Sequence, residues 1–140
     1  MRFLGVDYGS SRTGLAVSDP LGVTCRPFGI LAERDEDRLV AEILSTARQL
    51  AVEAIVVGVP RPLSGGTNQQ LETVLSFVRH LQRDAQIEQD AQFAVSVWDE
   101  RFTSSLARRG RSHSANEDAV AACYMLQSYL DAQSGTTGGR

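Results

Sequence analysis

The sequence predicts a single α/β domain built on a five-stranded mixed sheet with helices on both faces. Three observations carry this prediction. The chain has 140 residues, which is the usual size of one domain. Its first third contains short apolar segments divided by turn-forming residues, as in an antiparallel meander. After that, segments with helical periodicity alternate with short apolar runs, a pattern typical of strands joined by helices.

Three strands are expected in the first third of the chain. They span Phe3 to Asp7, Gly14 to Ser18 and Val23 to Leu31, with turns at residues 9–12 and 19–22. Pro27 lies inside the third segment and lacks the N–H that a strand ladder requires. The third strand is therefore expected at an edge of the sheet.

The rest of the domain is expected to alternate helices with strands. Leu39, Ile43, Ala47 and Leu50 recur at helical spacing. Capping-box pairs precede two further helices, Thr67 with Gln70 before the apolar residues from Leu71 to Leu81, and Ser114 with Glu117 before those from Val120 to Leu130. Short strands are expected at Ala54 to Gly58 and Phe93 to Trp98. We assign residues 1–131 to the domain, and expect the small, polar tail 132–140 to be disordered.

Composition restricts the classes of function. The net charge is −3, which argues against a passive nucleic-acid binder but is compatible with a nuclease that has an acidic metal site. The chain has no apolar run near the roughly 20 residues that a membrane span needs, and no signal peptide is evident. Cys25 and Cys123 are far apart in sequence and fit no metal or redox spacing. We therefore expect a cytoplasmic protein, not bound to a membrane, with reduced thiols in its core.

Carboxylates occupy the ends of three predicted elements. Asp7 ends the first strand, the pair Asp99 and Glu100 follows the last strand, and Asp118 lies in the first turn of the last helix. Carboxylate oxygens on rigid elements suit Mg²⁺ or Mn²⁺. Two such ions, roughly 3.5–4 Å apart, can activate water against a phosphodiester. Each acid alone has an ordinary explanation as a turn, a surface ion pair or a helix-dipole residue, so the prediction of a metal site rests on their coincidence.

Helical phase favours Asp118 over its neighbour Glu117 as a ligand. Asp118 shares a helix face with Ala122, Leu126 and Tyr129, and that face is apolar. A carboxylate that faces the core is costly unless a cation compensates it. Glu117 lies on another face and already has a predicted capping role.

Four segments of the chain resemble the YqgF/RuvX family, whose members are called pre-16S ribosomal RNA nucleases and Holliday junction resolvases. The resemblance runs from about Met1 to Asp131. It is carried by VDYGSSRTGLAVSDPLG at residues 6–22, VVGVP at 56–60, DERFTS at 99–104, and DAVAA at 118–122 with LQSYLD at 126–131. It implies an RNase H-like fold, which has the predicted element order; half of an actin-like ATPase has this order too.

The resemblance also implies roles for individual residues. Asp7, Glu100 and Asp118 would be the catalytic, metal-binding acids. Arg101 and Thr103 would lie beside the site, and Arg12 in the first hairpin. Independently of the resemblance, the arginines Arg101, Arg108, Arg109 and Arg111 cluster within eleven residues and suit contacts to phosphates. The chain departs from the family at Leu63–Gly66, which replaces an Asn-Met-Asp-Gly-like stretch, and in the short segment between Thr103 and Glu117.

A metal-dependent nuclease is the leading interpretation. Its expected partner is structured nucleic acid, either RNA, including a pre-ribosomal particle, or branched DNA. The sequence leaves open which substrate is natural, whether the ion is Mg²⁺ or Mn²⁺, and whether the chain forms a homodimer, as paired cuts in a DNA junction would require. Two alternatives are a non-catalytic ribosome-assembly factor that binds RNA and a small actin-like nucleotide-binding protein. The three acids disfavour the former and the chain length the latter.

Replacing Arg108, Arg109 and Arg111 together with alanine should separate binding from chemistry. Substrate affinity should fall, and the slope of log affinity against log salt should flatten by about 0.7–0.9 per lost phosphate contact. Turnover at saturating substrate should change much less, because uniform binding energy affects KM more than kcat. Salt-dependent binding and steady-state cleavage assays test this. Normal affinity with lost turnover would place the segment at the scissile phosphate instead.

Overall fold

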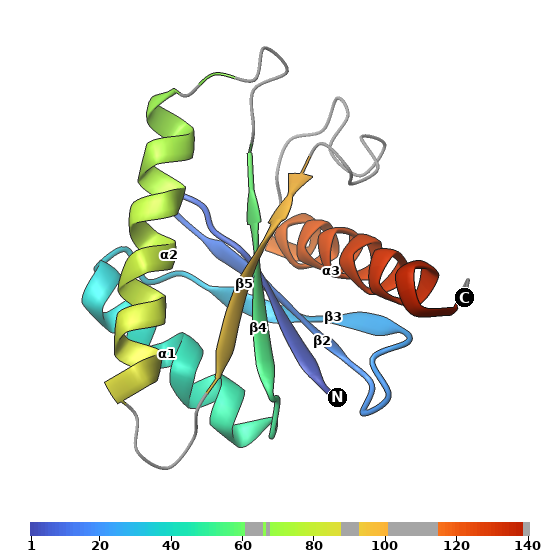
Figure 1. Cartoon of the computed structure of the whole chain (residues 1–140). Coiled ribbons are helices and arrows are strands. Elements are labelled where there is room, and N and C mark those ends of the chain that lie inside the picture. Colours follow the sequence, from blue (N-terminus) through green and yellow to red (C-terminus); the bar gives the residue numbers. More distant parts are fainter. Residues whose placement is uncertain (61–65, 67, 88–92, 101–114, 139–140) are drawn as a thin grey trace.

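Within the residues that the structure describes, eight helices and strands follow one another in the order that the sequence predicts (Figure 1). The structure, a computed structural model, describes residues 1–60, 66, 68–87, 93–100 and 115–138. The elements are β1 (Phe3–Asp7), β2 (Thr13–Ser18), β3 (Cys25–Leu31), α1 (Glu36–Gln49), β4 (Ala54–Val59), α2 (Gln69–Ile87), β5 (Ala94–Asp99) and α3 (Ala115–Gly138).

The five strands form one mixed sheet in the order β3-β2-β1-β4-β5. Strands β1 to β3 form the antiparallel meander, whereas β4 and β5 run parallel to β1. The predicted mixed sheet is thus confirmed, and so is the edge position of the strand that contains Pro27. The register between β2 and β3 shifts next to Pro27, which lies opposite Ala16.

Helices cover both faces of the sheet, and alternation along the strands creates two cores (Figure 1). Helices α1 and α2 pack over Leu4 and Val6 of β1 and form the larger core. Helix α3 packs on the opposite face, where Ala122, Met125 and Leu126 are fully buried. In the part of the chain that the structure describes, no helix is both long and apolar enough to span a membrane.

The helix ends agree with the sequence prediction only in part. The N-cap of α2 is Asn68, whose Oδ1 accepts a 2.8 Å hydrogen bond from the amide of Leu71, instead of the predicted Thr67. Thr67 and the other predicted cap, Ser114, lie outside the described residues. Helix α3 continues to Gly138, so residues 132–138 are helical where composition predicted disorder. Extending a helix that is already docked avoids the cost of nucleating one, which offsets the poor helix propensity of this tail.

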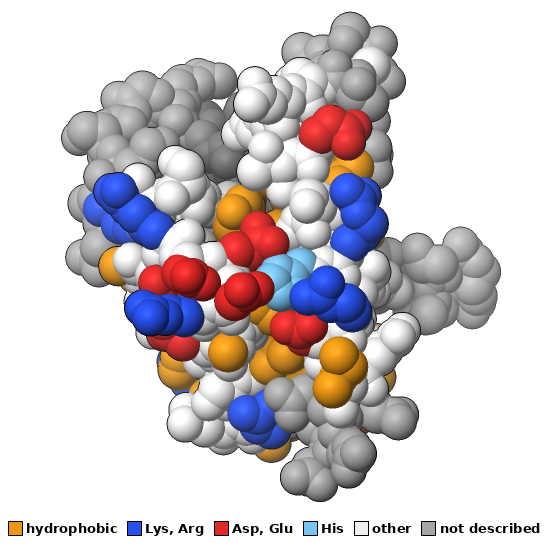
Figure 2. Space-filling model, turned by 90° about the vertical axis from the view of Figure 1, so that its left-hand side faces the viewer, with side chains coloured by type: hydrophobic (Ala, Val, Ile, Leu, Met, Phe, Trp, Pro, Cys, Tyr) orange, Lys and Arg blue, Asp and Glu red, His pale blue; other side chains and the backbone are white. Residues whose placement is uncertain are grey.

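The outer surface of α1 and α2 is acidic around a single histidine (Figure 2). The Nδ1 atom of His80 lies 2.7 Å from Glu36, and its Nε2 atom lies 3.2 Å from Asp37 and 3.4 Å from Asp84. His80 therefore links the two helices, as expected of a structural histidine. The same carboxylates make the centre of this face unfavourable for a phosphate backbone.

Strand directions bring four chain segments to one edge of the sheet. Because β1, β4 and β5 are parallel, their C-terminal ends lie at the same edge, and the antiparallel β2 begins there. Asp7 is paired with Gly14, and the first turn of α3 lies directly over Gly14. A Cβ atom at Gly14 would collide with the carbonyl oxygen of Asp118, so only glycine permits this approach of helix to strand.

Gly14→Ala should therefore lower the free energy of unfolding by about 1–3 kcal/mol, since backbone atoms, not a flexible side chain, have to move. Gly29→Ala is the matched control, because a Cβ at Gly29 of β3 meets no atom within 4 Å. That change should alter stability by less than about 0.5 kcal/mol. Urea unfolding of both variants measures the difference. Equal free energies of unfolding for the two variants would show that the docking of α3 does not require glycine at position 14.

Candidate active site

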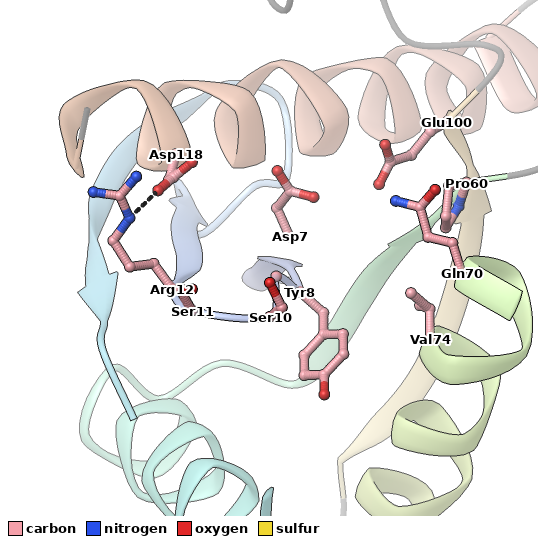
Figure 3. A pocket seen from close by; sticks show the side chains of 11 residues that line it. Asp7, Tyr8, Ser10, Ser11, Arg12, Pro60, Gln70, Val74, Glu100 and Asp118 are labelled. Carbon is pink, nitrogen blue, oxygen red and sulfur yellow. Dashed lines mark ion pairs between the residues drawn. The ribbon is translucent and has the colours of Figure 1, made fainter. Parts of the chain in front are cut away.

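A cavity of about 400 Å³ opens at the edge of the sheet where these segments meet (Figure 3). Its wall combines the end of β1, the following turn, the end of β4, the start of α2, the residue after β5 and the first turn of α3. The lining residues are Asp7, Tyr8, Gly9, Ser10, Ser11, Arg12, Pro60, Gln70, Val74, Glu100 and Asp118. The three predicted acids and Arg12 thus lie on one cavity wall.

Asp7 occupies the middle of the acidic wall in the close-up view (Figure 3). It is the last residue of β1, and alternation places it on the sheet face covered by α3, opposite to the buried Leu4 and Val6. A short strand with an aspartate at its C-terminal end therefore delivers this carboxylate to the cavity on a rigid support.

Glu100, and not Asp99, is the acid after β5 that lines the cavity. Asp99 is still paired with Val59 in the sheet. The side chain of Glu100 passes over Gly58 of β4, where an added Cβ would lie 2.7 Å from its Oε2 atom and 2.9 Å from Cγ of Met125. The glycine in the second motif thus leaves the space that the Glu100 carboxylate occupies.

Asp118 reaches the cavity from α3 and is paired with Arg12. The Nε atom of Arg12 lies 2.9 Å from Oδ2 of Asp118, and the Asp118 side chain is only 19% exposed. Ala122 and Leu126, which follow Asp118 on the same helix face, are fully buried against the sheet, as predicted from helical phase. The neighbouring Glu117 does not line the cavity.

The donor set of the cavity suits a divalent metal ion that prefers oxygen. All three acids present carboxylate oxygens from the ends of regular elements, and Gly58 leaves room beside one of them. As the side chains stand, however, no three acidic, histidine or cysteine side chains within the described ranges are grouped closely enough to hold a metal ion. Asp118 is instead engaged by Arg12. The ligand roles of the three acids therefore stay a prediction.

Sequence reasoning did not identify the opposite wall of the cavity. Tyr8 follows Asp7 directly, and its ring stacks on Phe77 of α2 with centroids 4.1 Å apart. Burial, reinforced by the negative charge of Glu36, raises the pKa of Tyr8, so its hydroxyl stays protonated at neutral pH. Gln70 and Val74 of α2 also line the cavity. The only sequence signal for Tyr8 was its place in the first motif.

Five predicted nucleic-acid contacts lie outside the described residues. They are Arg101, Thr103, Arg108, Arg109 and Arg111. Arg12 is the only residue of that predicted set whose position the structure describes, and it forms an ion pair with Asp118.

Comparison with known proteins identifies the family. The profile of the family described as "RuvX: Holliday junction resolvase" matches residues 1–132. A protein of Clostridium kluyveri is 34% identical and one of Moorella thermoacetica is 36% identical, each over 94% of this chain and at least 95% of its own length. Both are described as "Putative pre-16S rRNA nuclease".

Solved structures agree with the fold. RuvC of T. thermophilus in complex with Holliday junction substrate is similar with a TM-score of 0.60 and 16% identity, over 97% of this chain and 98% of that chain. The Fowlpox virus resolvase in complex with Holliday junction DNA has a TM-score of 0.55 and 10% identity, over 95% and 99%. These likenesses confirm the RNase H-like fold that the motifs implied. The match to the family profile and to the bacterial relatives shows that the chain belongs to the RuvX family of nucleases.

Proposed function

We propose that this chain is a divalent-metal-dependent phosphodiesterase whose active site is the cavity that contains Asp7, Glu100 and Asp118. One observation carries the proposal: three carboxylates from β1, from the residue after β5 and from α3 line one cavity at one edge of the sheet. Three separate elements deliver acids to this wall, and the fold includes two residues without side chains, Gly14 and Gly58, that accommodate them.

Electrostatics explains why such a site requires a cation. Among the described lining residues, three carboxylates face one guanidinium, so negative charges exceed positive charges by two. A phosphodiester would be repelled from this wall. We assign Mg²⁺ or Mn²⁺ to Asp7, Glu100 and Asp118, since both ions favour carboxylate ligands. Such an ion, when bound, supplies Lewis-acid activation of water and of the leaving oxygen.

The chain's own residues prepare the site for that chemistry. Asp7 and Glu100 are positioned by strand ends, and Asp118 by a helix docked on the sheet, so the backbone is in place and only the acidic side chains have to converge when an ion binds. Arg12 orients the Asp118 carboxylate through their 2.9 Å contact. It also adds the positive charge of one guanidinium to the cavity wall. Tyr8, whose ring is held by Phe77, forms part of the far wall.

Precursor 16S ribosomal RNA is the substrate that we favour. The similar bacterial proteins carry this substrate in their names and match nearly the whole chain. On this proposal the enzyme acts in ribosome biogenesis, on RNA within or beside a pre-ribosomal particle. The carboxylates clustered around His80 on α1 and α2 disfavour a phosphate backbone at that point, and we place the nucleic acid at the sheet edge that bears the cavity (Figure 2).

A four-way DNA junction is the second candidate substrate. The family description names this activity. Resolution of a junction requires two coordinated cuts, and a two-fold homodimer would place one cavity at each cut. Cleavage of a junction by this chain should therefore be accompanied by dimer formation, whereas RNA trimming needs a single copy.

Asp7→Asn tests the proposed function because it keeps the size of the side chain and removes one ligand charge. We expect the cleavage rate to fall by more than about 100-fold. Replacing a residue that only hydrogen-bonds to a metal ligand typically costs roughly 10–100-fold, and losing a ligand should cost more. The assay uses a precursor-rRNA fragment and a four-way DNA junction with Mg²⁺ and with Mn²⁺. Circular dichroism should show an unchanged fold.

Asp37→Asn is the matched control, since this carboxylate is 87% exposed on α1 and lies outside the cavity. It should cleave at the unmodified rate. If Asp7→Asn also cleaves at that rate, the assignment of the active site is wrong. If the unmodified chain binds either substrate but cleaves neither with either metal, the chain is a binding factor and not an enzyme.

A further inference from the structure

Two cysteines that lie 98 positions apart in sequence meet in space. Cys25 is the first residue of the edge strand β3, and Cys123 lies near the middle of α3. Their Sγ atoms are 3.3 Å apart, and the Cys25 thiol also lies 3.2 Å from the carbonyl oxygen of Cys123. The sequence predicted two separate thiols in the core, because their spacing follows no linear motif. The fold instead makes them a pair.

The pair is accessible to small molecules. Both cysteines are only partly buried, at the rim of the core between the sheet and α3. Cys25 also lines a cavity of about 300 Å³, together with Asp19, Thr24 and Arg26. This cavity is separate from the active site, which shares none of its residues. A small oxidant can therefore reach the sulfur atoms without unfolding the domain.

The two thiols differ in acidity. A hydrogen bond from Cys25 lowers the pKa of Cys123. The same hydrogen bond, followed by burial, raises the pKa of Cys25. The thiolate is the reactive form of cysteine, so Cys123 is the member of the pair that attacks first.

We propose that Cys25 and Cys123 form a redox-responsive pair, which a peroxide converts into an intramolecular disulfide that ties helix α3 to the edge strand β3. An S–S bond is about 2.05 Å long, so the sulfur atoms need to approach by only about 1.3 Å from their present separation. We expect side-chain rotation and a small shift of the edge strand to close this gap, because β3 is paired on one side only.

The reaction balances with one molecule of hydrogen peroxide. The Cys123 thiolate attacks one peroxide oxygen, an S–O bond forms, the O–O bond breaks, and the departing hydroxide is protonated to water. The Cys25 sulfur then attacks the Cys123 sulfenic acid, the S–S bond forms and the S–O bond breaks. The second hydroxide leaves and takes up the Cys25 proton as water. Two thiols are thus oxidised and one peroxide is reduced to two waters.

The disulfide would act on the helix that carries Asp118. Cys123 lies five residues after Asp118 on α3, and the first turn of this helix already touches β2. A bond that closes a loop of nearly one hundred residues strongly lowers the conformational entropy of the unfolded chain, and so favours the folded state. Oxidation should therefore raise the midpoint temperature of unfolding, by roughly 4–16 °C for a chain of this size.

The test is oxidation of the folded, fully reduced chain with hydrogen peroxide. We expect both thiols to become resistant to maleimide, the intact mass to show a monomer that has lost two hydrogens, and a peptide map to link Cys25 to Cys123. The unfolding midpoint should rise, and dithiothreitol should reverse every change. Intermolecular dimers as the main product, or overoxidation of separate cysteines without a link, would overturn the proposal.

The order of attack is tested on the unmodified chain, because each single serine variant removes the hydrogen bond that makes the two thiols unequal. Dimedone present during brief oxidation should trap the sulfenic acid on Cys123 and not on Cys25. Cys25→Ser leaves Cys123 without a resolving thiol, so its sulfenic acid should accumulate. Neither Cys25→Ser nor Cys123→Ser should gain thermal stability on oxidation. Equal trapping on the two cysteines of the unmodified chain would contradict the assignment of Cys123 as the attacking residue. The assay reads sulfur chemistry and stability alone, so its result does not depend on whether the chain cleaves nucleic acid.

Discussion

The structure depends on the close approach of α3 to a sheet surface that lacks side chains at the points of contact. The backbone of Asp118 lies over Gly14 of β2, and Glu100 and Met125 fill the space over Gly58 of β4. Close packing leaves no tolerance for an added methyl group at Gly14, where it would meet backbone atoms, and a methyl group at Gly58 would displace the side chains of Glu100 and Met125. The same contacts that dock the helix also set the positions of two acids, so the fold and the candidate active site rest on one constraint.

The opposite face of the sheet also holds a residue of the candidate active site in place. Helix α2 supplies Phe77, on which Tyr8 stacks, and so fixes the residue that follows Asp7.

The charge of the cavity is only partly balanced. Arg12 compensates one of the three carboxylates in the cavity. A site with surplus negative charge is costly to the folded protein and is retained where a cation or a substrate offsets the cost. The ion pair of Arg12 and Asp118 links this local charge balance to the turn between β1 and β2.

Much of the fold could be predicted because hydrophobic period is a local property of the sequence. The meander, the edge position of the strand with Pro27 and the burial of Ala122 and Leu126 all follow from patterns within a few residues. Long-range proximity could not be predicted this way. The Arg12–Asp118 pair, the contact of Cys25 with Cys123 and the place of Tyr8 against Phe77 join residues far apart in sequence. The choice of Glu100 over Asp99 depended on family resemblance, and alternation of the sheet faces supplies its physical reason.

The most direct measurement is the anomalous diffraction of crystals soaked in Mn²⁺. It tests the claim that the acidic wall is a metal-binding active site. The account predicts an anomalous peak within the cavity, with carboxylate oxygens of Asp7, Glu100 and Asp118 as its protein ligands and the expected Mn²⁺–oxygen distances of roughly 2.0–2.2 Å. A saturating soak that leaves the cavity without a peak, or that places Mn²⁺ only on other carboxylates such as those around His80, would contradict it.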